Sequence, residues 1–272
     1  MTNLLRAHFA RLWKSKLYWL CLVASYIMGI AFCNSALGSW AIAENYSWGS
    51  ELWGQPLCGF GLVCGILCAA FFSLFFGVEY GDKTVRNKVI AGHRRTEIYL
   101  SVLVVSVGAA LLLYLASLVN MLLRLDGMRQ IPLPDAGQAA MALAGTALLI
   151  VAVCSICTMF CMLVHKRAVL AVVLILLMVV LFAVSLQVED LYQTVTAEGM
   201  EMYVGPDGPE FIWHEAQGAG PTLTFLYNFL PVNQAYRYME LDATPVMLAY
   251  TTLLTAVTTA AGLFCFKRKN IM

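Results

Sequence analysis

Long apolar runs alternate with short polar segments along the whole chain. Six runs have no Asp, Glu, Lys, Arg or His in their interior: residues 17–38, 57–77, 98–123, 139–163, 168–187 and 245–266. Each is long enough to cross about 30 Å of hydrocarbon as a helix. Helices are expected because hydrocarbon cannot hydrogen-bond to loose backbone groups. The runs are continuous rather than alternating, which excludes a spanning β-barrel.

The composition agrees with this pattern. Of the 272 residues, 61% are hydrophobic and 12% are charged, whereas soluble domains carry about 25% charged residues. A chain with so few charges cannot cover a surface that faces water. We therefore expect an all-α integral membrane protein whose residues 1–272 form a single transmembrane domain.

The basic residues are distributed unevenly between the two sides that six spans define. Only Arg124, Arg129 and Arg237 lie on one side, and the other 14 of the 17 basic residues lie on the side that holds both termini. The positive-inside rule predicts that this second side is cytoplasmic. Both termini are thus expected in the cytoplasm.

Residues 1–16, before the first span, have the pattern of an amphipathic helix. Leu5, Phe9, Leu12 and Trp13 fall on one helical face, and Arg11 falls on the opposite side. This is typical of a helix that lies in the headgroup layer of a membrane. The alternative is a basic tail whose charges only set the topology.

Residues 188–244 form the longest connection, which is expected to be extracellular. Its charged residues are nine acids and Arg237. A Pro-Asp-Gly turn at 206–208 between β-prone flanks predicts a small hairpin, and the apolar segment 221–231 predicts a short helix. A connection of this length is usually functional, so we expect a short extracellular subdomain before the last span.

Catalytic and nucleotide-binding patterns are missing from the sequence. There is no G-x-x-x-x-G-K-[ST] segment for phosphate binding, no ionisable residue inside a span, and no pair of carboxylates placed for acid–base catalysis. Cys154, Cys157 and Cys161 share a helical face, which fits close packing or, alternatively, a soft-metal site. We expect no enzyme activity, no metal or cofactor in this chain, and no nucleic-acid partner.

The segment Val78–Arg95, VEYGDKTVRNKVIAGHRR, is the most charged part of the chain. Gly81 and Asp82 give a helix-start signal and Gly92 gives a stop signal, so a short cytoplasmic helix is predicted over residues 81–92. Val85 and Val89 share one face of it, beside Lys88. The alternative is a solvated loop that only sets the topology.

This segment resembles the cytoplasmic signature of ABC type-2 permeases, roughly E-[FY]-x-x-G-T-[IV]-R-N-K-x-x-x-G-x-x-R. The matching residues are Glu79, Tyr80, Thr84, Val85, Arg86, Asn87, Lys88, Gly92 and Arg95. FLPVNQA at 229–235 and FKRKNI at 266–271 are similar to further stretches of that family. Asp82-Lys83 departs from it where Gly is common, and Asn270 stands where Asp is common.

The resemblance implies the membrane subunit of a bacterial ABC exporter with the type V exporter fold. The helix at 81–92 would be a coupling helix that docks on a separate ATPase through Glu79, Asp82, Thr84, Val85, Arg86, Lys88 and Val89. Residues 1–16 would add a second contact. Two ATPase subunits, which bind ATP and Mg, and a second permease copy or a related permease would complete the transporter, surrounded by lipid in the plasma membrane.

Two functions remain open at this point. The first is ATP-driven export of an amphiphilic substrate such as a peptide, an antibiotic or a lipid, because the spans carry no buried charge for a small ion. The second is a non-transporting immunity or sensing subunit that binds a peptide or lipid through its extracellular loop.

Overall fold

The computed structural model describes residues 2–43, 49–81, 84–164, 166–196, 199–205, 208–214 and 218–268. Six of its helices are long and apolar enough to cross a membrane. They are α2 (Lys16–Ala43), α4 (Phe60–Gly81), α6 (Arg95–Leu123), α8 (Ala136–Leu163), α9 (Arg167–Thr196) and α12 (Pro245–Arg268). The prediction of a helical chain with six candidate spans is confirmed, and the chain is a multi-pass membrane protein.

Short elements connect these helices. They are α1 (Thr2–Lys14), the 3-10 helix η1 (Gly49–Trp53), α3 (Gly54–Cys58), α5 (Thr84–Ile90), α7 (Leu125–Met128), α10 (Pro221–Phe229) and α11 (Pro231–Met239). Strands β1 (Gly199–Gly205) and β2 (Gly208–His214) pair antiparallel, with Gly205 opposite Gly208. The expected hairpin and the helix expected at 221–231 are therefore both present.

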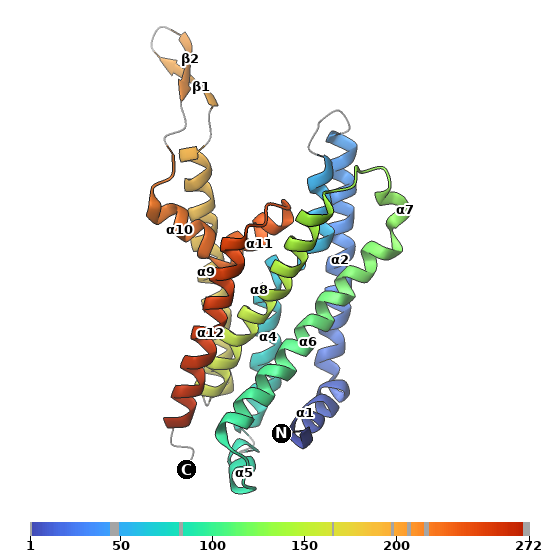
Figure 1. Cartoon of the computed structure of the whole chain (residues 1–272), viewed down its shortest axis with the longest axis vertical. Coiled ribbons are helices and arrows are strands. Elements are labelled where there is room, and N and C mark those ends of the chain that lie inside the picture. Colours follow the sequence, from blue (N-terminus) through green and yellow to red (C-terminus); the bar gives the residue numbers. More distant parts are fainter. Residues whose placement is uncertain are drawn as a thin grey trace.

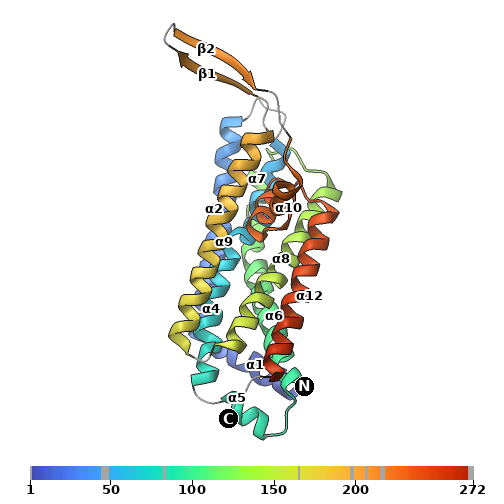
Figure 2. The same cartoon turned by 90° about the vertical axis from the view of Figure 1, so that its left-hand side faces the viewer.

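The two ends of the bundle differ in what they carry (Figure 1). Helix α1, helix α5 and the C-terminal end of α12 lie together at one end, which we call the α5 end. Helix α7 and the hairpin lie at the other, which we call the hairpin end. Figure 2 shows that the hairpin extends beyond the helices, away from the rest of the chain.

Several spanning helices are longer than predicted. Helix α2 reaches Ala43 rather than residue 38. Helix α9 continues to Thr196 rather than ending at 187, because residues 188–196 include no Gly or Pro that would stop it. The second span begins before residue 57, since η1 and α3 lead into α4 with a break at Gly59. These changes extend the spans without changing their order.

Close backbone contact joins α2 to α6. A Cβ added to Gly29 would lie 2.5 Å from the carbonyl oxygen of Ser117, so no larger residue fits at position 29 without moving a helix. Ser25 Oγ donates to the Leu113 carbonyl, and Asn120 Nδ2 donates to the Tyr26 carbonyl at 2.6 Å. Small residues and hydrogen bonds across helices are the usual means of holding membrane helices together.

The centre of the bundle contains cysteines and aromatic rings. Cys64, Cys68, Cys154, Cys157 and Cys161 are buried in one apolar cluster, and all are free thiols. Within the described ranges, no group of three or more His, Cys, Asp or Glu side chains is placed to hold a metal ion. The cysteines of α8 are surrounded by apolar side chains, where a thiol packs as a small apolar group.

Candidate functional site

Helix α5 forms a short connection between α4 and α6 at the α5 end (Figure 1). Its C-terminal end is fixed by Gly92, whose φ is +87°. The N–H of Gly92 donates to the Val89 carbonyl at 3.0 Å, and the N–H of His93 donates to the Lys88 carbonyl at 3.2 Å. This pair of bonds is a Schellman motif, so the predicted stop at Gly92 is confirmed.

The predicted start of this helix at Gly81 and Asp82 falls partly on Asp82 and Lys83, which lie outside the described residues. Gly81 is the last residue of α4, and α5 begins at Thr84. Residues 78–81 extend the spanning helix, because they contain no Pro to end it. Glu79 thus belongs to the last turn of α4.

Several predicted coupling residues have no described side chain. Asp82 lies outside the described residues, and the side chains of Glu79, Thr84, Val85 and Arg86 also lie outside the described part. For these last four residues, the structure gives the helical backbone position only. The described side chains of α5 begin at Asn87.

The described side chains of α5 are divided between the inside and the outside of the bundle. Val89 packs against the apolar core, and Lys88 is half-buried. Ile90 is 72% exposed, which makes it a large apolar side chain presented at this end of the molecule. The sequence pattern indicated Val85 and Val89 as the apolar face and gave no role to Ile90.

Lys88 joins α5 to α1. Its Nζ lies 3.1 Å from Nε2 of His8, and the His8 side chain is only 3% exposed. A lysine ammonium can only donate, so Nε2 of His8 is the acceptor when Lys88 is charged. The His8 ring also packs 6.3 Å from the Phe76 ring of α4. His8 therefore links three helices.

Helix α1 packs one row of side chains into the bundle and leaves others exposed. Leu4, His8 and Leu12 are buried, whereas Phe9 is 40% and Trp13 is 55% exposed; Leu5 is partly buried against the core. Burial thus follows a row of residues spaced by four, the spacing of one helix face. The apolar pattern did not indicate that His8 belongs to this buried row, and the membrane-facing role of Phe9 and Trp13 stays a prediction.

Arg11, which the sequence places opposite the apolar face of α1, contacts α4. Its Nη2 donates to the Phe75 carbonyl at 3.2 Å, and its guanidinium lies 5.0 Å from the centre of the Phe75 ring. Phe75 is buried in the core of α4. Arg11 thus fixes α1 against α4.

The start of α6 and the end of α12 complete the α5 end. Arg95 Nη1 donates to the Lys267 carbonyl at 2.9 Å, and the Tyr99 ring packs 6.3 Å from the Phe266 ring. Side-chain contacts of α1, α4, α5, α6 and α12 therefore meet at the α5 end.

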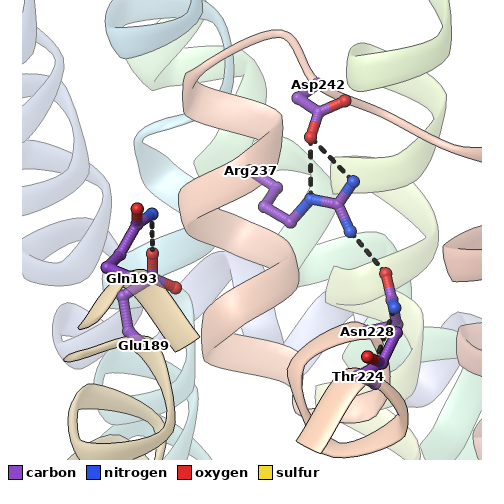
Figure 3. Close-up of polar contacts among 6 residues, drawn as sticks. All are labelled: Glu189, Gln193, Thr224, Asn228, Arg237 and Asp242. Carbon is purple, nitrogen blue, oxygen red and sulfur yellow. Dashed lines mark hydrogen bonds and ion pairs between the residues drawn. The ribbon is translucent and has the colours of Figure 1, made fainter. Parts of the chain in front are cut away.

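A polar network lies at the hairpin end (Figure 3). Arg237 of α11 is 8% exposed, and its Nε and Nη2 donate to Asp242 Oδ2 at 3.0 and 2.7 Å. Its Nη1 donates to the Asn228 side chain of α10. The guanidinium lies 5.3 Å from the Tyr227 ring, which stacks at 3.8 Å on Tyr192 of α9.

Two further amide side chains hold α11 in place. Gln234 Nε2 donates to the Asn228 carbonyl at 2.7 Å, and its Oε1 accepts from Thr251 of α12 at 2.6 Å. Asn233 Nδ2 donates to Glu189 Oε2 of α9 at 3.2 Å. Side chains of the FLPVNQA stretch therefore hydrogen-bond to α9, α10 and α12, a role that its sequence did not indicate.

Comparisons with protein-family models, with curated proteins and with solved structures found no match to this chain. The fold and the composition define the class: a multi-pass membrane protein with six helices that are long and apolar enough to cross a membrane. The more specific assignment depends on the sequence pattern of Val78–Arg95 and on the geometry around α5.

Proposed function

We infer that this chain is the permease subunit of an ATP-binding-cassette exporter in a bacterial plasma membrane, with both termini in the cytoplasm. ATP would be hydrolysed by two separate ATPase subunits, and a second copy or a related permease would complete the transport path. The substrate class favoured by spans without ionisable residues is an amphiphile such as a peptide, an antibiotic or a lipid.

One observation carries the proposal. A seven-residue helix held at both ends by apolar helices presents Ile90 to solvent and contacts α1 through Lys88 and His8. A solvated loop that only sets topology needs neither a Schellman stop nor a bond to a buried histidine. A helix that receives force from a partner needs a defined end and a contact with its neighbours, because a loosely held helix would move without displacing the spans.

The proposed mechanism follows from these contacts. An ATPase that grips α5 would push on α4 and α6 directly, since α5 lies between them in the chain. The Lys88–His8 and Arg11–Phe75 contacts would carry the same motion to α1. Coupling of this kind requires an element that has two conformations and that the ATPase binds more tightly in one of them. In the proposal, this element is the whole α5 end.

The test is co-purification from native membranes. The full-length chain is extracted in mild detergent, and cassette ATPases that remain bound are identified by mass spectrometry. We expect an ATPase in near-equal amount with the wild-type chain and a loss of most of it with Ile90→Asp, because a charge at the centre of an apolar contact is costly to bury.

Leu133→Asp is the matched control, since Leu133 is 81% exposed and precedes α8, which begins at the hairpin end. It makes the same chemical change far from α5 and should keep the ATPase bound. If both variants retained the ATPase equally well, α5 would not be the docking element. A native preparation without any cassette ATPase would contradict the exporter assignment itself.

A second candidate function is favoured by the hairpin. Strands β1 and β2 extend past the helices into the space beyond the hairpin end (Figure 2), where a non-transporting sensing or immunity subunit would bind a peptide or lipid. Replacing residues 199–214 with a short Gly-Ser linker separates the two functions. Export should persist in part for a transporter, whereas a sensor would lose ligand binding while any bound ATPase stays in place.

A further inference from the structure

A pocket of about 350 Å³ opens at the α5 end, where α1 meets α2. It is lined by Arg11, Lys14, Ser15, Leu17, Leu74 and Phe75. The cationic and hydroxyl side chains come from the end of α1 and the junction with α2. The apolar side chains come from the start of α2 and from α4. The pocket is therefore polar on one side and apolar on the other.

The cationic side of this pocket is held in position. The Arg11 guanidinium donates to the Phe75 carbonyl and lies over the Phe75 ring. Lys14 follows Arg11 by three residues, which places the two side chains next to each other on the surface of α1. Lys14 is exposed at the end of that helix. Two cations thus stand side by side at one rim of the pocket.

The apolar side of the pocket continues onto exposed apolar side chains of the candidate spans. Leu74 of α4 is 55% exposed, and Leu20, one turn after Leu17 on α2, is 66% exposed. Trp13 and Trp19 stack at 5.5 Å beside this junction, and Trp19 Nε1 donates to the Trp13 carbonyl at 2.9 Å. Exposed tryptophans are typical of the boundary between headgroups and hydrocarbon, so the pocket lies at headgroup depth.

We propose that this pocket binds an anionic glycerophospholipid of the leaflet on the α5 side. Its phosphate lies against Lys14 and Arg11, and one acyl chain follows Leu17 and Leu74 along the groove. Basic pockets between membrane helices are suited to anionic headgroups. The proposal needs only a membrane-embedded chain and is independent of the transport function.

The test is native mass spectrometry of the full chain, released from detergent in the presence of phosphatidylglycerol or phosphatidylcholine with identical acyl chains. We expect the wild-type chain to retain phosphatidylglycerol preferentially. Lys14→Gln should reduce that retention about fivefold, the effect expected for one basic residue near a membrane surface. Phosphatidylcholine retention should not change.

Lys16→Gln is the matched control, because Lys16 is exposed and close by but does not line the pocket. It should retain phosphatidylglycerol as the wild type does, and so should Lys14→Arg. Equal retention of the two lipids by the wild type would overturn the proposal. Equal losses of phosphatidylglycerol in the Lys14 and Lys16 variants would also overturn it. So would binding of inorganic phosphate that is as tight as binding of the lipid at equal concentration.

Discussion

Nζ of Lys88 lies 3.1 Å from Nε2 of His8, so a side chain of the connection between α4 and α6 reaches a buried histidine of the N-terminal helix. The two residues are 80 positions apart in the chain. Their contact joins the two elements that the proposed function assigns to the ATPase. It makes α1 and α5 one mechanical unit rather than two separate contacts.

The first prediction concerns this contact. In a double-mutant cycle with His8→Leu and Lys88→Met, we expect a coupling free energy of about 1 kcal/mol, the usual net value of a hydrogen bond. Hydrogen exchange of the α5 amides, followed by mass spectrometry, measures it. His93→Leu serves as the control and should leave the Lys88 effect unchanged. Additive single-variant effects would show that the two side chains are not coupled.

The second prediction concerns the packing of α2 on α6. Gly29→Val should lower the free energy of unfolding by about 1–3 kcal/mol, the usual range for overpacking, because its Cβ meets the Ser117 carbonyl. Thermal unfolding in detergent measures the change. Gly38→Val is the control on the same helix, since a Cβ there has no neighbour within 4 Å. Equal effects of both substitutions would mean that the close contact with Ser117 is not the cause of the loss.

The third prediction concerns the polar network at the hairpin end. Arg237→Met keeps most of the side-chain stem but removes the bonds to Asp242 and Asn228, so it should cost about 2 kcal/mol. Exchange of the α10 and α11 amides should rise at the same time. Arg129→Met is the comparison, because its ion pair with Asp126 is exposed and such pairs contribute little. An equally large loss of stability in the Arg129 variant would contradict the idea that burial makes the Arg237 bonds more stabilising.

The six spans and the stop of α5 follow from the sequence because each depends on local information. An apolar run of sufficient length and a glycine with positive φ act without reference to distant residues. The end of α4 was not predictable in this way, since Gly81 continues that helix. Glycine permits a break in a helix but does not require one.

Helix α11 and the burial of His8 were missed for a different reason. Asn233, Gln234 and Arg237 have the composition of a surface loop, yet they are buried because residues of α9, α10 and α12 supply hydrogen-bond partners. His8 is likewise buried beside a lysine 80 positions away. Polar residues that are satisfied by distant segments cannot be recognised from the periodicity of one segment.

Glu240 follows α11 in the same region and has a raised pKa. Partial burial is the main cause, and the neighbouring carboxylates of Glu189, Glu51 and Asp242 add to it, while Arg237 opposes it. An acid with a raised pKa is ionised at neutral pH at a cost to the folded state. That cost disappears as the pH falls through the folded-state pKa, because the carboxyl group then becomes neutral.

The fourth prediction is therefore a gain in stability that depends on pH. Glu240→Gln should be more stable than the wild type at pH 7, by less than about 1 kcal/mol because the residue keeps contact with solvent, which screens its charge. Thermal unfolding in detergent at a series of pH values measures the difference, which should close as the pH falls through the pKa of the carboxyl group. Asp126→Asn, at an exposed acid outside the network, should show no such trend. A stability difference between Glu240→Gln and wild type that stays constant with pH would rule out ionisation as its source.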